Sequence, residues 1–286
     1  MPTPLPARNI FDGTANPTTS QMKTALGSLR DYLAEMFGTA GGAPVGVTSI
    51  NGGQLAGLRN KITNGAFSIN QRGLSGTVTL SAGQYGHDFW KAGASGCTYT
   101  FTTVNGLTTI TILAGSLVQV VRGTNLDSGT HVLSWIGTAQ GKIGAGAYAA
   151  SGIAGSVTGG ANLAVEFGVG TLTKVQFEPG TIPTVFERIP NELTLALCKP
   201  RGQIVFGGFG GPSVAGGNGS GPIAYPVQPD GTPTVTWLGA VFTNNFPDSA
   251  PAIASITPYG FRALRTAVAS GQDSSFMDTY FVEVNI

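Results

Sequence analysis

Charged side chains are scarce in this 286-residue chain. Asp, Glu, Lys and Arg make up 10% of it, against about 25% in an average soluble protein. The 15 basic and 14 acidic residues nearly balance, and no run of Lys or Arg occurs. Because nucleic-acid phosphates are bound by clustered basic residues, we expect no nucleic-acid partner.

Cysteine and long apolar runs are scarce as well. Cys97 and Cys198 lie far apart, no CxxC pair occurs, and only His87 and His131 could join them at a metal. We therefore expect no metal site and no cofactor, and we favour two buried free thiols over a disulfide. No segment reaches the roughly 18 apolar residues of a membrane-spanning helix, so we expect no membrane insertion.

Glycine and β-forming residues are abundant instead. The chain has 44 glycines and 17 prolines, and short segments rich in Thr, Val and Ile recur with turn residues between them. The segment 98–104 alternates, with Tyr99 and Phe101 on one face, and Asn105-Gly106 is a hairpin signal before the next strand at 107–113. Many short strands of this kind predict an antiparallel β-sandwich.

One segment has the pattern of an amphipathic helix. Thr18, Thr19 or Ser20 can cap it, and Gln21 to Phe37 contains strong helix formers. Its apolar residues follow the spacing of a heptad seam, and these are Met22, Leu26, Leu29, Leu33 and Met36. Two readings remain open, a helix packed on its own domain and a short trimeric coiled coil, and we favour the second. A second short helix is expected at 54–62.

The fold predicted from these patterns is mainly β and has four parts. Residues 1–63 form an attachment arm, the axial helix and a linker, and 64–200 form the central antiparallel β-sandwich. A Gly-rich linker or loop follows at 201–222, because the run Gly207–Gly221 is of low complexity. Residues 223–286 resume strand patterning and form a small C-terminal β-domain.

Two spaced signatures bracket the central block. The first, NGxFxxxQRG…YxxDxW, runs from Asn64 to Trp90, and the second, QxExGxxxTxFE…EL…C, runs from Gln176 to Cys198. Together they resemble the central module of tailed-phage tail fibres and related host-recognition proteins, and the resemblance covers about 65–200. In that family the two signatures open and close a jelly-roll-like module with carbohydrate-binding character.

The resemblance implies a virion protein of the tail fibre or baseplate, made in the bacterial host's cytoplasm. It implies a homotrimer that attaches to the baseplate or to another fibre protein through residues 1–60. It also implies recognition of a host surface polysaccharide. The alternatives are a structural baseplate or tail connector without host contact, and a polysaccharide depolymerase.

We do not expect an enzyme. The acids Glu178, Glu187 and Glu192 belong to the closing signature, and no pair of acids has a spacing that forces the two to face each other, as glycoside hydrolysis requires. His87-Asp88 lacks a nucleophile motif beside it, and Asp88 is expected to accept hydrogen bonds from a turn or from Arg72.

Sugar binding is expected to use aromatic and arginine side chains, because aromatic rings stack on sugars and Arg adds hydrogen bonds. The glycan-binding candidates are Trp237, Phe242, Tyr259 and Arg262 in the distal β-domain, and Trp90 in the opening signature. The competing interpretation is that these aromatic residues fill hydrophobic cores, and we favour it both for Trp90 and for the aromatic residues of the distal domain.

Overall fold

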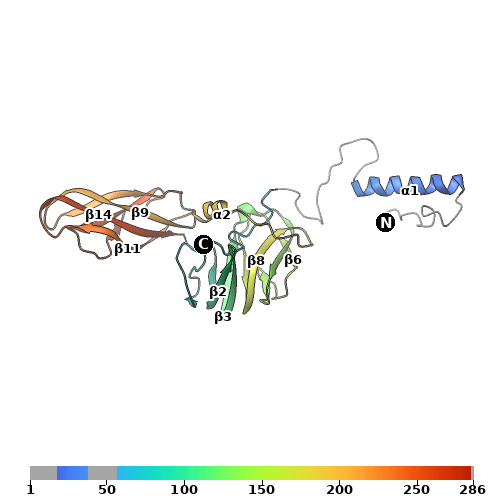
Figure 1. Cartoon of the computed structure of the whole chain (residues 1–286), viewed down its shortest axis with the longest axis horizontal. Coiled ribbons are helices and arrows are strands. Elements are labelled where there is room, and N and C mark those ends of the chain that lie inside the picture. Colours follow the sequence, from blue (N-terminus) through green and yellow to red (C-terminus); the bar gives the residue numbers. More distant parts are fainter. Residues whose placement is uncertain (1–17, 38–56, 285–286) are drawn as a thin grey trace. The chain divides into compact units, whose positions relative to one another are not determined.

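The computed structural model describes residues 18–37 and 57–284, and it divides the chain into two units, 1–57 and 58–286 (Figure 1). In the first unit, α1 spans Thr19–Phe37. Thr18 and Gln21 cap it reciprocally: Gln21 N donates to Thr18 Oγ1 at 3.3 Å, and Thr18 N donates to Gln21 Oε1 at 2.8 Å. The predicted helix is therefore confirmed. The attachment arm at 1–17 lies outside the described residues.

The predicted heptad seam is only partly visible on α1. Met22 is 36% exposed and Leu26 is 55% exposed, whereas Leu29 is half-buried. The side chains of Leu33 and Met36 lie outside the described residues. The two exposed members leave part of this face available to another molecule.

The central part of the second unit is an antiparallel, sandwich-like fold, as predicted. Its strands pair in the order β1-β2-β3-β8-β4-β6, and β7 joins β3 to β5. The long strands β2 and β3 and the neighbouring β8 are seen in Figure 1. The elements are β1 (Val78–Leu80), β2 (Lys91–Val104), β3 (Leu107–Val121), η2 (Gly123–Asn125), β4 (Gly129–Ile136), β5 (Gly141–Ile143), β6 (Ile153–Val157), β7 (Leu163–Phe167), β8 (Gly170–Pro179) and α2 (Asn191–Cys198).

The hairpin turn between β2 and β3 lies at Asn105-Gly106, as the sequence predicted. Asn105 and Gly106 have φ angles of 51° and 70°, the left-handed conformation that a tight primed turn requires. Tyr99 then points into the core beside Ile110 and Ile112 of β3, and all three side chains are at most 1% exposed. Successive side chains of a strand point to opposite faces of the sheet, so the alternating apolar residues of the sequence all lie on the buried face.

The short helix predicted at 54–62 is not present in its described part, because none of the residues 57–62 is helical. Asn60 explains this conformation: its Nδ2 donates to Val175 O at 3.0 Å, and its Oδ1 accepts from Phe177 N at 3.0 Å. Lys61 N also donates to Phe177 O at 2.7 Å. Hydrogen bonds to β8 therefore replace those of a helix.

The C-terminal part contains two three-stranded antiparallel sheets, β10-β13-β12 and β11-β14-β9. Aromatic residues fill the core that they share, with Phe261 and Tyr280 4.9 Å apart and Phe246 and Phe276 5.3 Å apart between ring centroids. The strands are β9 (Gly202–Ser213), β10 (Asn218–Ala224), β11 (Thr234–Asn244), β12 (Ala252–Ala254), β13 (Gly260–Thr266) and β14 (Gly271–Glu283).

The prediction of a Gly-rich linker at 201–222 is wrong, because β9 and most of β10 lie within it. The glycines allow close packing instead of flexibility. A Cβ atom at Gly207 would lie 2.6 Å from Ile223 Cγ1, and one at Gly221 would lie 2.6 Å from Gly208 O. Larger side chains would push these strands apart, so the C-terminal β-domain begins at Gly202, about twenty residues earlier than predicted.

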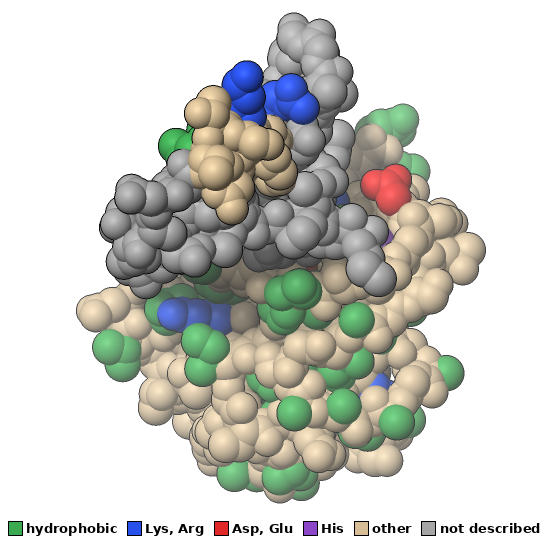
Figure 2. All heavy atoms as spheres, turned by 90° about the vertical axis from the view of Figure 1, so that its right-hand side faces the viewer, with side chains coloured by type: hydrophobic (Ala, Val, Ile, Leu, Met, Phe, Trp, Pro, Cys, Tyr) green, Lys and Arg blue, Asp and Glu red, His purple; other side chains and the backbone are tan. Residues whose placement is uncertain are grey.

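The scarcity of charge in the sequence is visible on the surface. On the face of the molecule shown in Figure 2, blue and red side chains are few among hydrophobic and uncharged ones. No helix in the described part of the chain is long and apolar enough to cross a membrane.

Candidate functional site

The opening signature forms a buried hydrogen-bond network. Asn64 Nδ2 donates to Ile69 O at 2.9 Å and to Asp88 O at 3.0 Å, and Trp90 Nε1 donates to Asn64 O at 3.1 Å. Asp88 accepts from Gln71 N at 2.8 Å and from Gln71 Nε2 at 2.7 Å. Asp88 is therefore the turn anchor that the sequence predicted.

The closing signature forms a second hydrogen-bond network of this kind. Glu178 is fully buried, and its carboxylate accepts 2.7 Å hydrogen bonds from Gln176 Nε2, Thr184 N and Thr184 Oγ1. Glu187 N donates to Gln176 Oε1 at 2.7 Å, and Glu187 Oε2 accepts from Asn60 N at 2.8 Å. Glu187 therefore holds the end of the sandwich to its beginning, and Glu178 fixes the local turn at Thr184.

Trp90 is not available for stacking on a sugar, so its place among the glycan-binding candidates is a wrong prediction. Its side chain is 0% exposed and packs 4.7 Å from Phe67 and 5.9 Å from Phe167 between ring centroids. Trp90 fills the sandwich core, which is the interpretation that the sequence favoured.

Trp237 and Phe242 lie together on β11 but differ in exposure. Trp237 is half-buried against the C-terminal core, and its Nε1 donates to Asp278 Oδ1 at 3.2 Å. Phe242 is 48% exposed, and it pairs across the ladder with Met277, which is 39% exposed. Trp237 therefore has a packing role, and Phe242 forms an exposed apolar pair with Met277 on the β11-β14-β9 sheet.

Tyr259 and Arg262 come together at a hollow on the other sheet. This cavity of about 390 Å³ lies over β10 and β13 and is lined by Pro222, Ile223, Ala224, Ser255, Thr257, Tyr259, Gly260, Phe261 and Arg262. Its size falls within the usual range of ligand pockets, which begins near 300 Å³. The structure thus brings together two of the predicted residues and separates them from the other two.

Local hydrogen bonds hold the backbone of Tyr259 and one end of the Arg262 side chain at the hollow. Thr257 Oγ1 accepts from Tyr259 N and from Gly260 N at 3.2 Å each, and Tyr225 N donates to Tyr259 O at 3.1 Å. The backbone of Tyr259 is held in a tight turn while its side chain remains 74% exposed. Arg262 Nε donates to Ser220 Oγ at 3.1 Å, which leaves the end of its guanidinium free to turn toward a ligand.

The remaining reactive residues are engaged or buried. Cys97 and Cys198 are free and buried, as predicted, and burial raises the pKa of the Cys97 thiol to about 11. His87 Nδ1 lies 2.9 Å from the Tyr99 hydroxyl, deep in the sandwich. Among residues 18–37 and 57–284, no group of three His, Cys, Asp or Glu side chains is placed to hold a metal ion.

Sequence reasoning did not find a second cavity, which lies where the sandwich meets the C-terminal domain. Arg122, Arg201 and Asp230 line it. They come from three distant segments, so no spacing or motif could have indicated them.

Comparisons with protein-family models, with curated proteins and with solved structures found no match to this chain.

Proposed function

We propose that this chain is a non-catalytic receptor-binding protein of a phage tail fibre or baseplate, and that its C-terminal domain binds a host surface glycan. The observation that carries the proposal is the hollow lined by Tyr259 and Arg262. An exposed aromatic ring next to an apolar floor suits the C–H face of a sugar. A guanidinium at the rim suits its hydroxyls or an acidic substituent.

The proposed homotrimer and its attachment rest on the exposed side chains of α1. Met22 and Leu26 are exposed at heptad spacing, so three copies of the helix could bury these side chains against one another. A homotrimer would present three hollows, and several weak sugar sites on one particle gain avidity through effective concentration. Residues 1–60 would contact the baseplate or another fibre protein.

Binding of the full-length protein to polysaccharide from the host surface tests the proposal. Tyr259→Ala and Arg262→Gln should each weaken binding about tenfold, because one stacking contact or one charged hydrogen bond contributes about 1–2 kcal/mol. Phe242→Ala is the matched control, since it removes an exposed aromatic ring of the same domain that lies outside the hollow.

The outcomes separate the alternatives. Equal loss in Phe242→Ala would move the site to the β11-β14-β9 sheet. Normal adsorption of particles that carry Tyr259→Ala together with Arg262→Gln would contradict a receptor site here and favour the structural connector. Release of reducing sugar from the polysaccharide would favour the depolymerase.

A further inference from the structure

Arg201 is a buried arginine that does not use all its hydrogen-bond donors. It directly precedes β9, and its side chain is 3% exposed. Nη1 donates to Val120 O at 3.1 Å, and the guanidinium lies 4.4 Å from the centre of the Phe89 ring. In the described part of the chain, neither Nε nor Nη2 has a hydrogen-bond acceptor. Leaving buried donors unpaired is costly, by about 1–3 kcal/mol and more for charged groups.

The two unpaired donors share one edge of the guanidinium. Nε and Nη2 point the same way from the planar group, and this edge forms a fork that matches the two oxygens of a carboxylate or phosphate. The aromatic face of Phe89 and the bond to Val120 O hold the plane in place. Arg201 therefore presents a fixed fork for an oxyanion.

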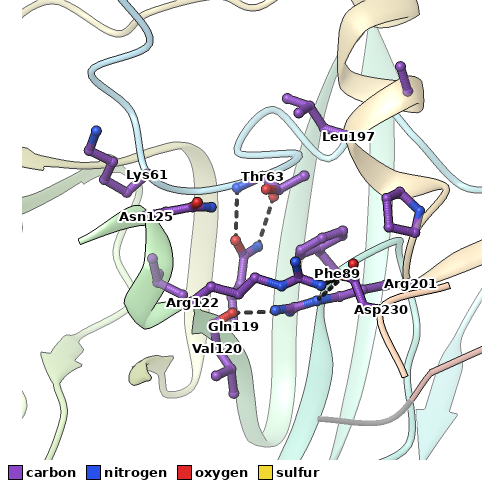
Figure 3. Close-up of a pocket in the computed structure, with 13 residues that line it drawn as sticks. Lys61, Thr63, Phe89, Gln119, Val120, Arg122, Asn125, Leu197, Arg201 and Asp230 are labelled. Carbon is purple, nitrogen blue, oxygen red and sulfur yellow. Dashed lines mark hydrogen bonds and ion pairs between the residues drawn. The ribbon is translucent and has the colours of Figure 1, made fainter. Parts of the chain in front are cut away.

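Arg201 lines the cavity of about 270 Å³ shown in Figure 3. Liquid water occupies about 30 Å³ per molecule, so this space exceeds the needs of one or two bridging waters. Among the described residues that line the cavity, three are cationic, Lys61, Arg122 and Arg201, and one is a carboxylate, Asp230. This local excess of positive charge contrasts with the near-neutral chain.

Asp230 does not satisfy both arginines. It forms an ion pair with Arg122 Nη2, and its Oδ2 lies 3.7 Å from Arg201 Nε, which is too long for a hydrogen bond. Burial lowers the pKa of Arg201 to about 10, and the positive charge of Arg122 acts in the same direction. A second anion would relieve both effects.

We propose that this cavity binds an oxyanion, as phosphate or as a carboxylate, through the Nε and Nη2 donors of Arg201 and with the charge of Arg122 beside it. The side chains of Arg122 and Asp230 are 31% and 16% exposed, so a solute can reach the cavity from the solvent. The site shares no lining residue with the hollow at Tyr259 and does not depend on the proposed glycan binding.

Calorimetric titration of the full-length protein with inorganic phosphate, and separately with acetate, tests the site at constant ionic strength set by chloride. We expect saturable binding of one phosphate per chain. Arg122→Gln should weaken it about tenfold or more, because a charge-assisted hydrogen bond is worth at least one order of magnitude. Arg201→Gln should abolish it, and circular dichroism should show whether that buried substitution still folds.

Asp230→Asn gives a test with the opposite sign. It removes the one carboxylate among the described residues that line the cavity, so phosphate should bind more tightly than to the wild type. Arg188→Gln is the control for charge alone, because Arg188 is outside the cavity, and Arg262→Gln should also leave phosphate affinity unchanged. Acetate binding of equal strength would assign the site to carboxylates as well as phosphates. Absence of saturable binding by both anions, in the wild type and in Asp230→Asn, would overturn the proposal.

Discussion

His87 is a buried imidazole whose titration links the stability of the sandwich to pH. Burial, with a smaller contribution from the charge of Arg72, lowers the pKa of His87 from 6.5 to about 4. The unfolded chain takes up this proton near pH 6.5, whereas the folded protein does so only near pH 4. The folded state is therefore fully favoured above pH 6.5 and loses stability as the pH falls through this window, by about 3 kcal/mol at the lower end.

Urea unfolding at several pH values measures this contribution. His87→Gln removes the titrating group, so its free energy of unfolding should change less between pH 6.5 and pH 4 than that of the wild type. Tyr99→Phe is the matched control, because it removes the partner hydroxyl and leaves the imidazole. It should lower stability at every pH and keep most of the slope. An unchanged slope in His87→Gln would contradict the assignment.

At the scale of elements, Asp278 holds the two sheets of the C-terminal domain together. It lies on β14 and accepts from Arg265 of β13 at 2.7 Å and 3.1 Å, and from the Tyr280 hydroxyl at 3.0 Å. The side chains of Arg265 and Asp278 are 1% and 0% exposed. A buried ion pair of this kind is sensitive to the loss of one partner, because the other charge then remains buried and unpaired.

Asp278→Asn should therefore destabilise the domain by about 3–5 kcal/mol. Chemical denaturation followed by tryptophan fluorescence can measure it, since Trp237 bonds to Asp278. Asp248→Asn is the control at an exposed aspartate of the same domain, with an expected effect within about 0.5 kcal/mol. Equal stability of the two variants would show that the pair contributes little.

We predict that α1 provides the principal contact of the proposed trimer. Leu29→Asp places a carboxylate in the proposed seam, where an unpaired buried charge is strongly unfavourable. Sedimentation velocity of the full-length protein should then shift from trimer toward monomer. Thr24→Asp adds the same charge at an exposed position off the seam and should leave the trimer intact. A trimer that survives Leu29→Asp would place the principal contact elsewhere.

Elements with a local signal were predictable from the sequence. The cap at Thr18 and the turn at Asn105-Gly106 each depend on neighbouring residues, and both are present as expected. The run Gly207–Gly221 was misread because glycine marks flexible loops and also strands whose backbones approach closely. Close contacts such as that of Gly207 with Ile223 decide between the two, and these contacts belong to the folded state.

The candidate site was predictable only in part for the same reason. Tyr259 and Arg262 were predicted as members of one domain, together with Trp237 and Phe242, but only the fold shows that these two line the same hollow. Trp237 and Phe242 alternate toward different surroundings on a strand with two irregularities in its register, which the pattern does not reveal. Arg201 and Asp230 meet through packing alone, and no local pattern predicts their cavity.

At the scale of residues 58–286, the opening signature also connects the sandwich to the C-terminal domain. Gln71 Nε2 donates to Gly202 O at 2.7 Å, and Arg72 forms an ion pair with Glu283 and lies 4.5 Å from the centre of the Phe281 ring. Val284 N donates to Arg201 O at 2.9 Å. These contacts fix both ends of the C-terminal domain, β9 and β14, to one turn of the sandwich.

We therefore expect the sandwich and the C-terminal domain to unfold in one cooperative transition. In scanning calorimetry of the wild type, the calorimetric and van't Hoff enthalpies of this transition should agree. Gln71→Ala combined with Arg72→Ala removes the hydrogen bond to Gly202 and the ion pair to Glu283, each worth about 1–3 kcal/mol. It also removes the Gln71 side-chain hydrogen bond to Asp88 within the sandwich. The transition should then split in two, with the C-terminal domain melting first. Arg188→Ala should leave a single transition. Arg188 belongs to the closing signature, and among the contacts described it bonds only to the exposed Asn105 carbonyl.

Two transitions in the wild type would contradict the coupling. They would also mean that the cavity at Arg201 lies between domains that open independently, so its anion affinity would fall as the C-terminal domain melts.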